Sequence, residues 1–139
     1  MFSSDEKKII LSVDDMPSNL IAIKSILEPT FDVRLAKEGD QAIALLKREK
    51  IDLVLLDIEM PGQNGFEIAQ IIRKDPATAH IPIIFVTTHA TPSFIQRAAK
   101  IGAQGYILKP FKPSVLLQKV LEQLGMDNPI ARQDTTCTF

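Results

Sequence analysis

Apolar and polar positions recur along this chain with two periods, one typical of strands and one typical of helices. The unbroken apolar run Leu53–Leu56 predicts a strand that is covered on both faces. Leu20, Ile23 and Leu27 recur at helical spacing and predict a helix. Residues 31–36 alternate between apolar and polar up to Leu35, which predicts a half-exposed strand at a sheet edge.

Extended over the whole chain, these patterns predict five strands that alternate with five helices. The predicted strands cover residues 8–13, 31–36, 53–56, 81–86 and 105–108. We expect all of them except the second to be buried. Strands that alternate with helices predict βαβ units and a parallel sheet with helices on both faces. Residues 126–139 lack periodicity, so we expect one domain over residues 1–125, followed by a flexible tail over 126–139.

Composition is that of a globular domain, with 45% hydrophobic and 24% charged residues among 139. The formal net charge of −1 gives no bulk electrostatic reason to expect nucleic acid or an anionic membrane as a partner. The single cysteine, Cys137, cannot form an internal disulfide, which fits a reducing, cytoplasmic setting. The apolar run at residues 9–13 is too short for a signal peptide or a membrane span.

Polar side chains stand at the carboxyl ends of four predicted strands: Asp14 and Asp15, then Asp57, then Thr87 and Thr88, then Lys109. In a parallel sheet these ends lie at one edge, so the side chains converge. Two carboxylates ~4 Å apart repel by roughly 4 kcal/mol at an effective dielectric of about 20. Lys109 can offset one charge, and the remainder calls for a hard divalent cation. An oxygen-only site suits Mg²⁺, and no Cys or His spacing suggests zinc.

In this order, the motifs resemble the receiver domain of bacterial two-component response regulators over about residues 8–124. The motifs are Val13-Asp14-Asp15, Leu56-Asp57-Ile58-Glu59-Met60-Pro61-Gly62 with Gly65 following, Ile83-Ile84-Phe85-Val86-Thr87, and Leu108-Lys109-Pro110-Phe111. The resemblance implies a flavodoxin-like doubly wound (βα)5 fold. This is a three-layer α/β sandwich around a parallel five-stranded sheet in the order 2-1-3-4-5.

The resemblance also implies a role for each residue of the cluster. Asp57 corresponds to the phosphoacceptor, a nucleophilic carboxylate. Asp14, Asp15 and Asp57 correspond to the Mg²⁺ site, with the backbone carbonyl of Glu59 as a further ligand. Lys109 would neutralise charge on the transferring phosphoryl group.

Two further residues correspond to the switch that reads out the phosphoryl group. Thr87 corresponds to the switch hydroxyl, and Tyr106 to the switch aromatic that follows it. The resemblance implies a cis peptide bond between Lys109 and Pro110, which would direct Lys109 into the site.

Three positions near the acceptor are candidates for tuning the lifetime of the phosphorylated state. Thr88 stands where the family usually has a smaller residue, and its bulk would restrict access. We hypothesise that Glu59 and His89 control the attacking water. The alternative is that both are solvated loop residues with no kinetic role.

The resemblance implies a phosphoryl donor, either a sensor histidine kinase or a phosphotransfer protein, and a downstream protein target or output domain. The expected output face combines the fourth helix, the fifth strand and the fifth helix. By helical phase its candidate contacts are Arg97, Lys100, Gln118 and Lys119. A phosphorylation-dependent homodimer is compatible with such a face. The chain could be a stand-alone receiver or the first part of a longer regulator.

Two other functions compete with this one. A Mg²⁺-dependent phosphatase with an aspartyl-phosphate intermediate would use an acid two residues after its nucleophile, where Glu59 stands, but would need an inserted cap to form a substrate pocket. An FMN-binding electron carrier would need a phosphate-cradling loop after the first strand, where this chain has Asp14 and Asp15. We therefore expect no enzyme activity beyond self-catalysed phosphoryl transfer and dephosphorylation.

Overall fold

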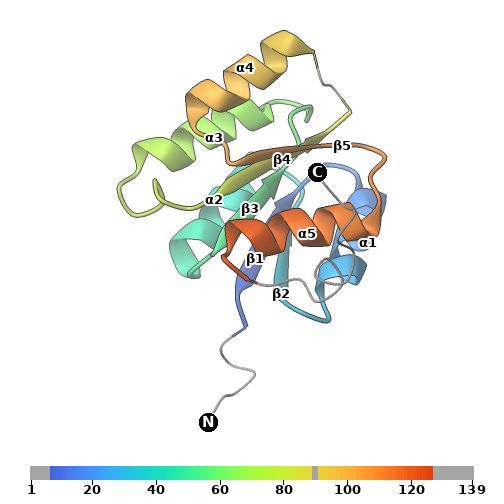
Figure 1. Ribbon diagram of the computed structural model, residues 1–139. Coiled ribbons are helices and arrows are strands. Elements are labelled where there is room, and N and C mark those ends of the chain that lie inside the picture. The colour runs from blue at the N-terminus through green and yellow to red at the C-terminus, as the bar shows by residue number, and fades with distance from the viewer. Residues whose placement is uncertain (1–6, 89–90, 127–139) are drawn as a thin grey trace.

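The computed structural model describes residues 7–88 and 91–126 and arranges them as an alternating α/β fold (Figure 1). Its ten elements are β1 (Ile9–Val13), α1 (Pro17–Leu27), β2 (Asp32–Ala36), α2 (Gly39–Arg48), β3 (Leu53–Leu56), α3 (Gly65–Lys74), β4 (Ile83–Thr87), α4 (Pro92–Ile101), β5 (Gly105–Leu108) and α5 (Pro113–Gln123). No helix in the described ranges is both long enough and apolar enough to cross a membrane.

The five strands form one parallel sheet in the order β2-β1-β3-β4-β5. The chain winds outward from β1 in both directions, so the helices divide between the two faces of the sheet. Figure 1 shows α1 and α5 on one face and α2, α3 and α4 on the other. The doubly wound fold and the strand order expected from the sequence are therefore confirmed.

Two apolar layers hold the sandwich together, one on each face of the sheet. Val54 and Leu56 of β3 pack into the layer beneath α2, α3 and α4, together with Phe66. The alternate residues Leu53 and Leu55 pack against α1 and α5. Successive side chains of a strand point to opposite faces, and β3 is covered on both, which explains its continuous apolar run.

The two edge strands differ in how well the sequence predicted them. β2 is half-buried along most of its length, as its alternating pattern indicated. β5 was expected to be buried, and this was wrong: only Ile107 is buried, and Leu108 is 47% exposed. β5 is the outermost strand beside β4, so it lacks a second neighbour. Its short apolar sequence gave no sign of that position.

The boundaries of β4 differ from the predicted ones and include Thr87 in the strand. The strand begins at Ile83, two residues later than predicted, and Thr87 is its last residue. Pro82 precedes the strand, and its carbonyl accepts a hydrogen bond from the N–H of Val54 at 3.0 Å. A proline has no N–H to donate, so this position costs no sheet hydrogen bond. The expected tail over 126–139 lies outside the described residues except for Met126, so its flexibility stays a prediction.

Candidate functional site

The site lies at the carboxyl edge of the sheet, where backbone hydrogen bonds continue the strands for one residue. The N–H of Asp14 donates to the carbonyl of Ala36 at 3.1 Å, and the N–H of Asp57 donates to that of Val13 at 3.0 Å. Asp14 and Asp57 therefore leave adjacent strands at the same level. This is the crevice in which open α/β sheets bind ligands.

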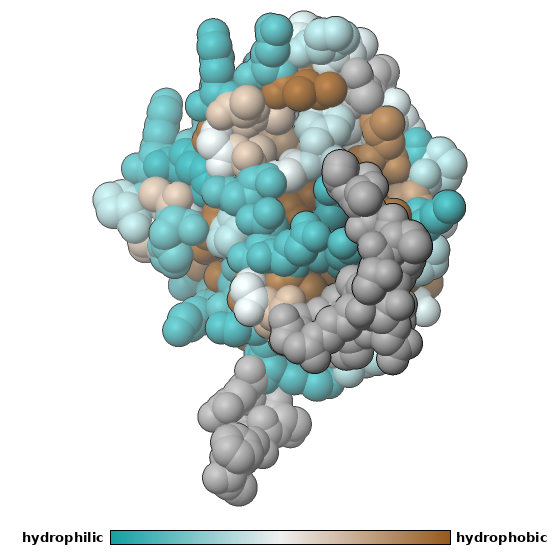
Figure 2. Space-filling view, in the orientation of Figure 1, coloured by the Kyte–Doolittle hydropathy of each residue, from teal (hydrophilic) through white to brown (hydrophobic). Residues whose placement is uncertain are grey.

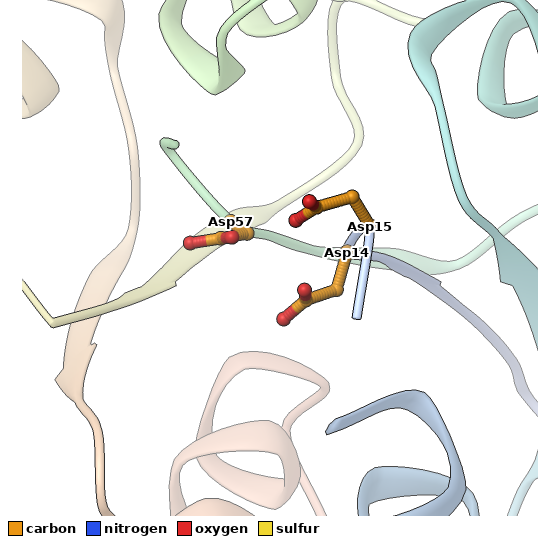
Figure 3. A group of neighbouring side chains, drawn as sticks. All are labelled: Asp14, Asp15 and Asp57. Carbon is orange, nitrogen blue, oxygen red and sulfur yellow. The ribbon is translucent and has the colours of Figure 1, made fainter. Parts of the chain in front are cut away.

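Three carboxylates converge there. Asp14, Asp15 and Asp57 each offer one oxygen, and these oxygens all lie within 4.8 Å of one another. Figure 3 shows the three side chains grouped at the ends of two strands. Asp14 and Asp57 are 2% and 6% exposed, so water screens their repulsion poorly. Clustered hard oxygen donors of this kind fit Mg²⁺.

Lys109 brings an ammonium group into contact with two of these carboxylates. Its Nζ donates a hydrogen bond to Oδ2 of Asp14 at 2.8 Å and lies 3.5 Å from Oδ1 of Asp57. The Lys109–Pro110 peptide bond is cis, as the resemblance implied. The lysine N–H also donates to the carbonyl of Thr87 at 2.8 Å. β4 and β5 together thus position this cation over the two acids.

Asp14 is fixed by two more donors. Its Oδ1 accepts from the backbone N–H of Met16 at 2.9 Å, and its Oδ2 accepts from Nδ2 of Asn19 at 3.1 Å. With Lys109, three donors therefore hold this carboxylate. The contribution of Asn19 was missed from the sequence. Its place in the first turn of the helix that follows Asp14 and Asp15 was the available signal.

Asp57 accepts hydrogen bonds from Lys109 and from the backbone N–H of Ile58, but these do not offset the effect of burial on its pKa. Burial raises the pKa of Asp57 from 3.8 to about 6, although the charge of Lys109 lowers it and that of Asp14 raises it further. Burial dominates because it removes water from the charged form, and one cation at 3.5 Å does not compensate. A cation between the carboxylates would favour the ionised form.

The turn after Asp57 approaches that residue closely. A Cβ placed on Gly65 would clash with the backbone carbonyl oxygen of Asp57, so only glycine fits at the start of α3. The N–H of Gly65 donates to the carbonyl of Ile58 at 2.8 Å. Asn64 caps the helix by accepting from the N–H of Glu67 at 3.0 Å, while the side chain of Glu67 accepts from the N–H of Asn64. Hydrogen bonds therefore hold both ends of the loop that joins Asp57 to α3.

Beside the carboxylates lies an open cleft of about 620 Å³. Asp15, Asp57 and Lys109 form part of its wall, with Glu59 and Thr88. Both of these last side chains are exposed, so they can meet a molecule that approaches Asp57. The rest of its lining is mainly apolar and consists of Asn19 together with Met16, Ala22, Ile26, Pro110, Phe111 and Pro113. His89, the third tuning candidate, lies outside the described residues.

The two switch candidates lie on β4 and β5, the strands that position Lys109. Thr87 is fully buried, at the end of β4. Tyr106 is half-buried on the neighbouring strand, and its ring centroid lies 6.4 Å from that of Phe85. Partial burial raises the pKa of the Tyr106 hydroxyl above its usual range. The structure therefore places both residues on adjacent strands, and their switching role stays a prediction.

The four candidate contacts of the output face do not lie on one surface. Arg97 and Lys100 line a cleft with residues of α3, and the guanidinium of Arg97 lies 4.4 Å from the ring centroid of Phe66. Both are exposed, as helical phase indicated, but they lie on the α3 side of α4 rather than on a face shared with β5 and α5, because helical phase identifies an exposed face without its neighbour. Gln118 and Lys119 of α5 are half-buried.

Comparison with known proteins gives consistent matches. The family model for the response regulator receiver domain matches residues 10–121. Protein PilH of Pseudomonas aeruginosa is 38% identical over 112 residues, which cover 80% of this chain and 93% of PilH. A probable cyclic di-GMP phosphodiesterase of Vibrio cholerae is also 38% identical, over 111 residues, but the chain spans only 25% of that protein.

A solved structure agrees with these sequence matches. The crystal structure of a CheY-like response regulator receiver domain protein from Methanospirillum hungatei superimposes with a TM-score of 0.81 at 32% identity. The match covers 86% of this chain and 95% of the other.

Proposed function

Because this chain belongs to the response regulator receiver domain family, we propose that it is a phosphorylation switch of two-component signalling that accepts a phosphoryl group on Asp57. One observation carries the proposal. Asp57 is a buried carboxylate at a strand end, with Asp14, Asp15 and Lys109 grouped around it. Asp14 is already held by three donors, whereas Asp57 faces the open cleft.

The chemistry assigned to Asp57 is an in-line displacement. One of its carboxylate oxygens forms a bond to phosphorus, and the bond between phosphorus and the leaving atom of the donor breaks. With a histidine kinase or a phosphotransfer protein as donor, the leaving atom is an imidazole nitrogen, which keeps the electron pair. Lys109 lies 3.5 Å from Asp57 and can donate a hydrogen bond to a phosphoryl oxygen with little movement.

The acidic cluster would hold Mg²⁺ through Asp14, Asp15 and Asp57, with the carbonyl of Glu59 as a further ligand. The bound cation would supply positive charge for the phosphoryl oxygens. Asp14 can contribute without moving, because Met16 and Asn19 fix its carboxylate. Ionised Asp57 serves both as ligand and as nucleophile.

The response to phosphorylation begins at Thr87, whose backbone carbonyl accepts a hydrogen bond from the N–H of Lys109. A new phosphoryl group offers acceptor oxygens to the Thr87 hydroxyl, and Tyr106 on the neighbouring strand responds. The affected surface would combine α4, β5 and α5. Exposed apolar side chains on it support a protein target, namely Ile95, Leu108 and Val115, which are 46%, 47% and 38% exposed. Figure 2 shows hydrophobic patches near α4 above the more hydrophilic α5.

The proposal extends to the setting of the domain. Residues 1–125 would form the receiver and 126–139 a tail, and the donor and the target would meet it in the cytoplasm. The target is a downstream protein, an output domain or a second phosphorylated copy. The domain would turn over no substrate other than its own acyl phosphate.

Incubation with acetyl phosphate and Mg²⁺, followed by intact-protein mass spectrometry, tests the proposal. The wild-type chain should gain one phosphoryl group, and Asp57→Asn should gain none. Asp40→Asn makes the same acid-to-amide change at an exposed position of α2 and should react like the wild type. An unreactive wild type, or an Asp57→Asn variant that reacts normally, would refute it. Continuous phosphate release without accumulation of phosphoprotein would favour the phosphatase alternative.

A further inference from the structure

A basic cleft of about 430 Å³ lies between the carboxyl-terminal halves of α3 and α4. Its lining consists of Gln70, Arg73, Lys74, Arg97, Lys100 and Ile101. Four of these six side chains carry a positive charge and none carries a negative one, although the whole chain has a formal net charge of −1. Such clustering creates a local positive potential that the overall charge does not reveal.

Arg73 forms a fixed part of this cleft, and among the described residues its charge has no acidic partner. Its guanidinium donates only to neutral acceptors, which are the carbonyls of Ile101 (3.3 Å), Ala79 (3.1 Å), Ile81 (2.6 Å) and Gly102 (2.9 Å) and Oε1 of Gln104 (3.1 Å). Five bonds use all the donors of an arginine. Arg73 therefore joins α3 to the segments around α4 and contributes charge, while the other cations remain available to a ligand.

Those other cations are exposed, and one of them is positioned in advance. The guanidinium of Arg97 lies over the ring of Phe66 at 4.4 Å, which restrains its position. Arg97 and Lys100 are three residues apart, hence on one side of α4, and Lys74 faces them from α3. Within the part of the chain that the structure describes, no carboxylate forms an ion pair with any of these three.

Helix dipoles account for only part of this charge. Basic residues often occupy the last turn of a helix because its carboxyl end carries roughly half a negative charge. Two helix ends therefore offset about one of the four charges. Asp75, next to Lys74, offsets another while it accepts a hydrogen bond from the N–H of Ala77. About two positive charges remain without compensation.

We propose that this cleft binds a small ligand that carries two or more adjoining phosphate groups, such as a polyphosphate or a nucleoside triphosphate. Lys74, Arg97 and Lys100 contact the phosphates. The positive charge of Arg73 adds to the electrostatic attraction without contacting the ligand. The cleft is open and offers only Ile101 as an apolar contact, which suits a highly charged ligand better than an apolar one. This site shares no lining residue with the cleft at Asp57.

Titration of the ¹⁵N-labelled full chain with inorganic triphosphate, at low ionic strength and without divalent metal, tests the proposal by NMR. Shift changes should be confined to the carboxyl-terminal halves of α3 and α4. Replacing Lys74 and Lys100 by Gln should weaken binding by at least about tenfold. Lys47→Gln with Arg48→Gln removes the matching basic pair from the last turn of α2 and should leave binding unchanged.

A second titration with ATP separates the two sources of phosphate. Tighter binding than triphosphate would assign contacts to the nucleoside, and equal binding would assign the affinity to the phosphates alone. Absence of shifts at millimolar triphosphate, shifts spread over all basic surfaces, or equal losses in both double variants would overturn the proposal. The wild-type shift map decides the location even if a variant fails to fold.

Discussion

Lys109 donates a hydrogen bond to Asp14 at 2.8 Å across 95 positions of sequence. The lysine lies farther, 3.5 Å, from the carboxylate that we propose to be phosphorylated. In the unphosphorylated protein the ammonium is therefore held mainly by Asp14. It stands within a short movement of a phosphoryl group on Asp57, which would draw it away from Asp14.

Replacing Lys109 by Met should separate metal binding from phosphorylation. The carboxylates remain, and they lose a competing cation, so Mg²⁺ affinity should stay the same or increase. Phosphoryl transfer from acetyl phosphate should slow by about a hundredfold, because a donor to the transferring group is lost. Metal titration and the rate of phosphoprotein formation check the two effects. Lys109→Arg keeps the charge and should lose less rate, and an unchanged rate in Lys109→Met would contradict the assigned role.

The raised pKa of Asp57 predicts that Asp57→Asn stabilises the protein without metal. The folded pKa is about 6 against an ordinary value of 3.8, so the folded state binds this proton more tightly than the unfolded state. The ionised carboxylate therefore destabilises the fold increasingly as pH rises from about 4 to above 6. We expect Asn to add about 1–2 kcal/mol at pH 7.5, after allowance for solvent screening.

Urea denaturation in the presence of EDTA measures this gain. The same pair of proteins at about pH 3 provides the control, because Asp57 is then largely neutral in both the folded and the unfolded state and the difference should nearly vanish. A gain of equal size at both pH values would mean that charge burial is not its cause.

The same pKa predicts how metal binding depends on pH. Mg²⁺ and the proton compete for Asp57, and at pH 5 only about a tenth of a group with a pKa of about 6 is ionised. The apparent Kd for Mg²⁺ should therefore rise about tenfold from pH 7 to pH 5. Isothermal titration at both pH values checks this. Asp57→Asn should bind more weakly and lose most of the pH dependence, and a wild type without that dependence would argue against Asp57 as a ligand.

Local patterns predicted the strands, and the rule that parallel strands end at one edge predicted the grouping of Asp14, Asp15 and Asp57. The sheet order was implied by the family resemblance and is confirmed. The apolar pattern of residues 105–108 led us to expect a buried strand, although the implied order places it at the edge, because an apolar strand looks alike in either position. Helical phase showed that Arg97 and Lys100 are exposed, but only the packing of α4 on α3 shows which residues they meet.

Contacts between distant segments were the other gap. The five hydrogen bonds of Arg73 reach residues from 79 to 104, and no periodicity within α3 indicates them. The close approach of Gly65 to the carbonyl of Asp57 is similar, because a glycine after a Pro-Gly turn suggests only flexibility. Such features depend on where the chain returns in space.

Alanine substitution at the tuning positions should change the lifetime of the phosphorylated state. Thr88→Ala opens the cleft wall beside Asp57, so both phosphorylation by acetyl phosphate and hydrolysis should accelerate. Glu59→Ala and His89→Ala remove the side chains assigned to control of the attacking water and should shift the half-life by severalfold. Timed loss of phosphoprotein after removal of the donor measures each. Half-lives equal to that of the wild type in Glu59→Ala and His89→Ala would leave these two as solvated loop residues.

Two glycines at the first position of a helix provide a matched test of the turn after Asp57. At Gly65 an added methyl group meets the backbone of Asp57 and Ile58, which β3 and the turn hold in place. At Gly39 it meets the end of the Gln63 side chain, which can rotate away. Gly65→Ala should therefore cost about 2–3 kcal/mol of unfolding free energy, whereas Gly39→Ala should cost less than about 1 kcal/mol, since Ala favours the helix.

Denaturation by urea gives both free energies, and phosphorylation by acetyl phosphate shows whether the backbone shift reaches the acceptor. Gly65→Ala should also slow phosphorylation, because the displaced atoms belong to Asp57 itself. Gly39→Ala should react like the wild type, since the Gln63 side chain can rotate away without moving the backbone next to Asp57. Equal destabilisation of the two variants would show that helix propensity or burial at the first turn, rather than contact with Asp57, requires glycine at both positions.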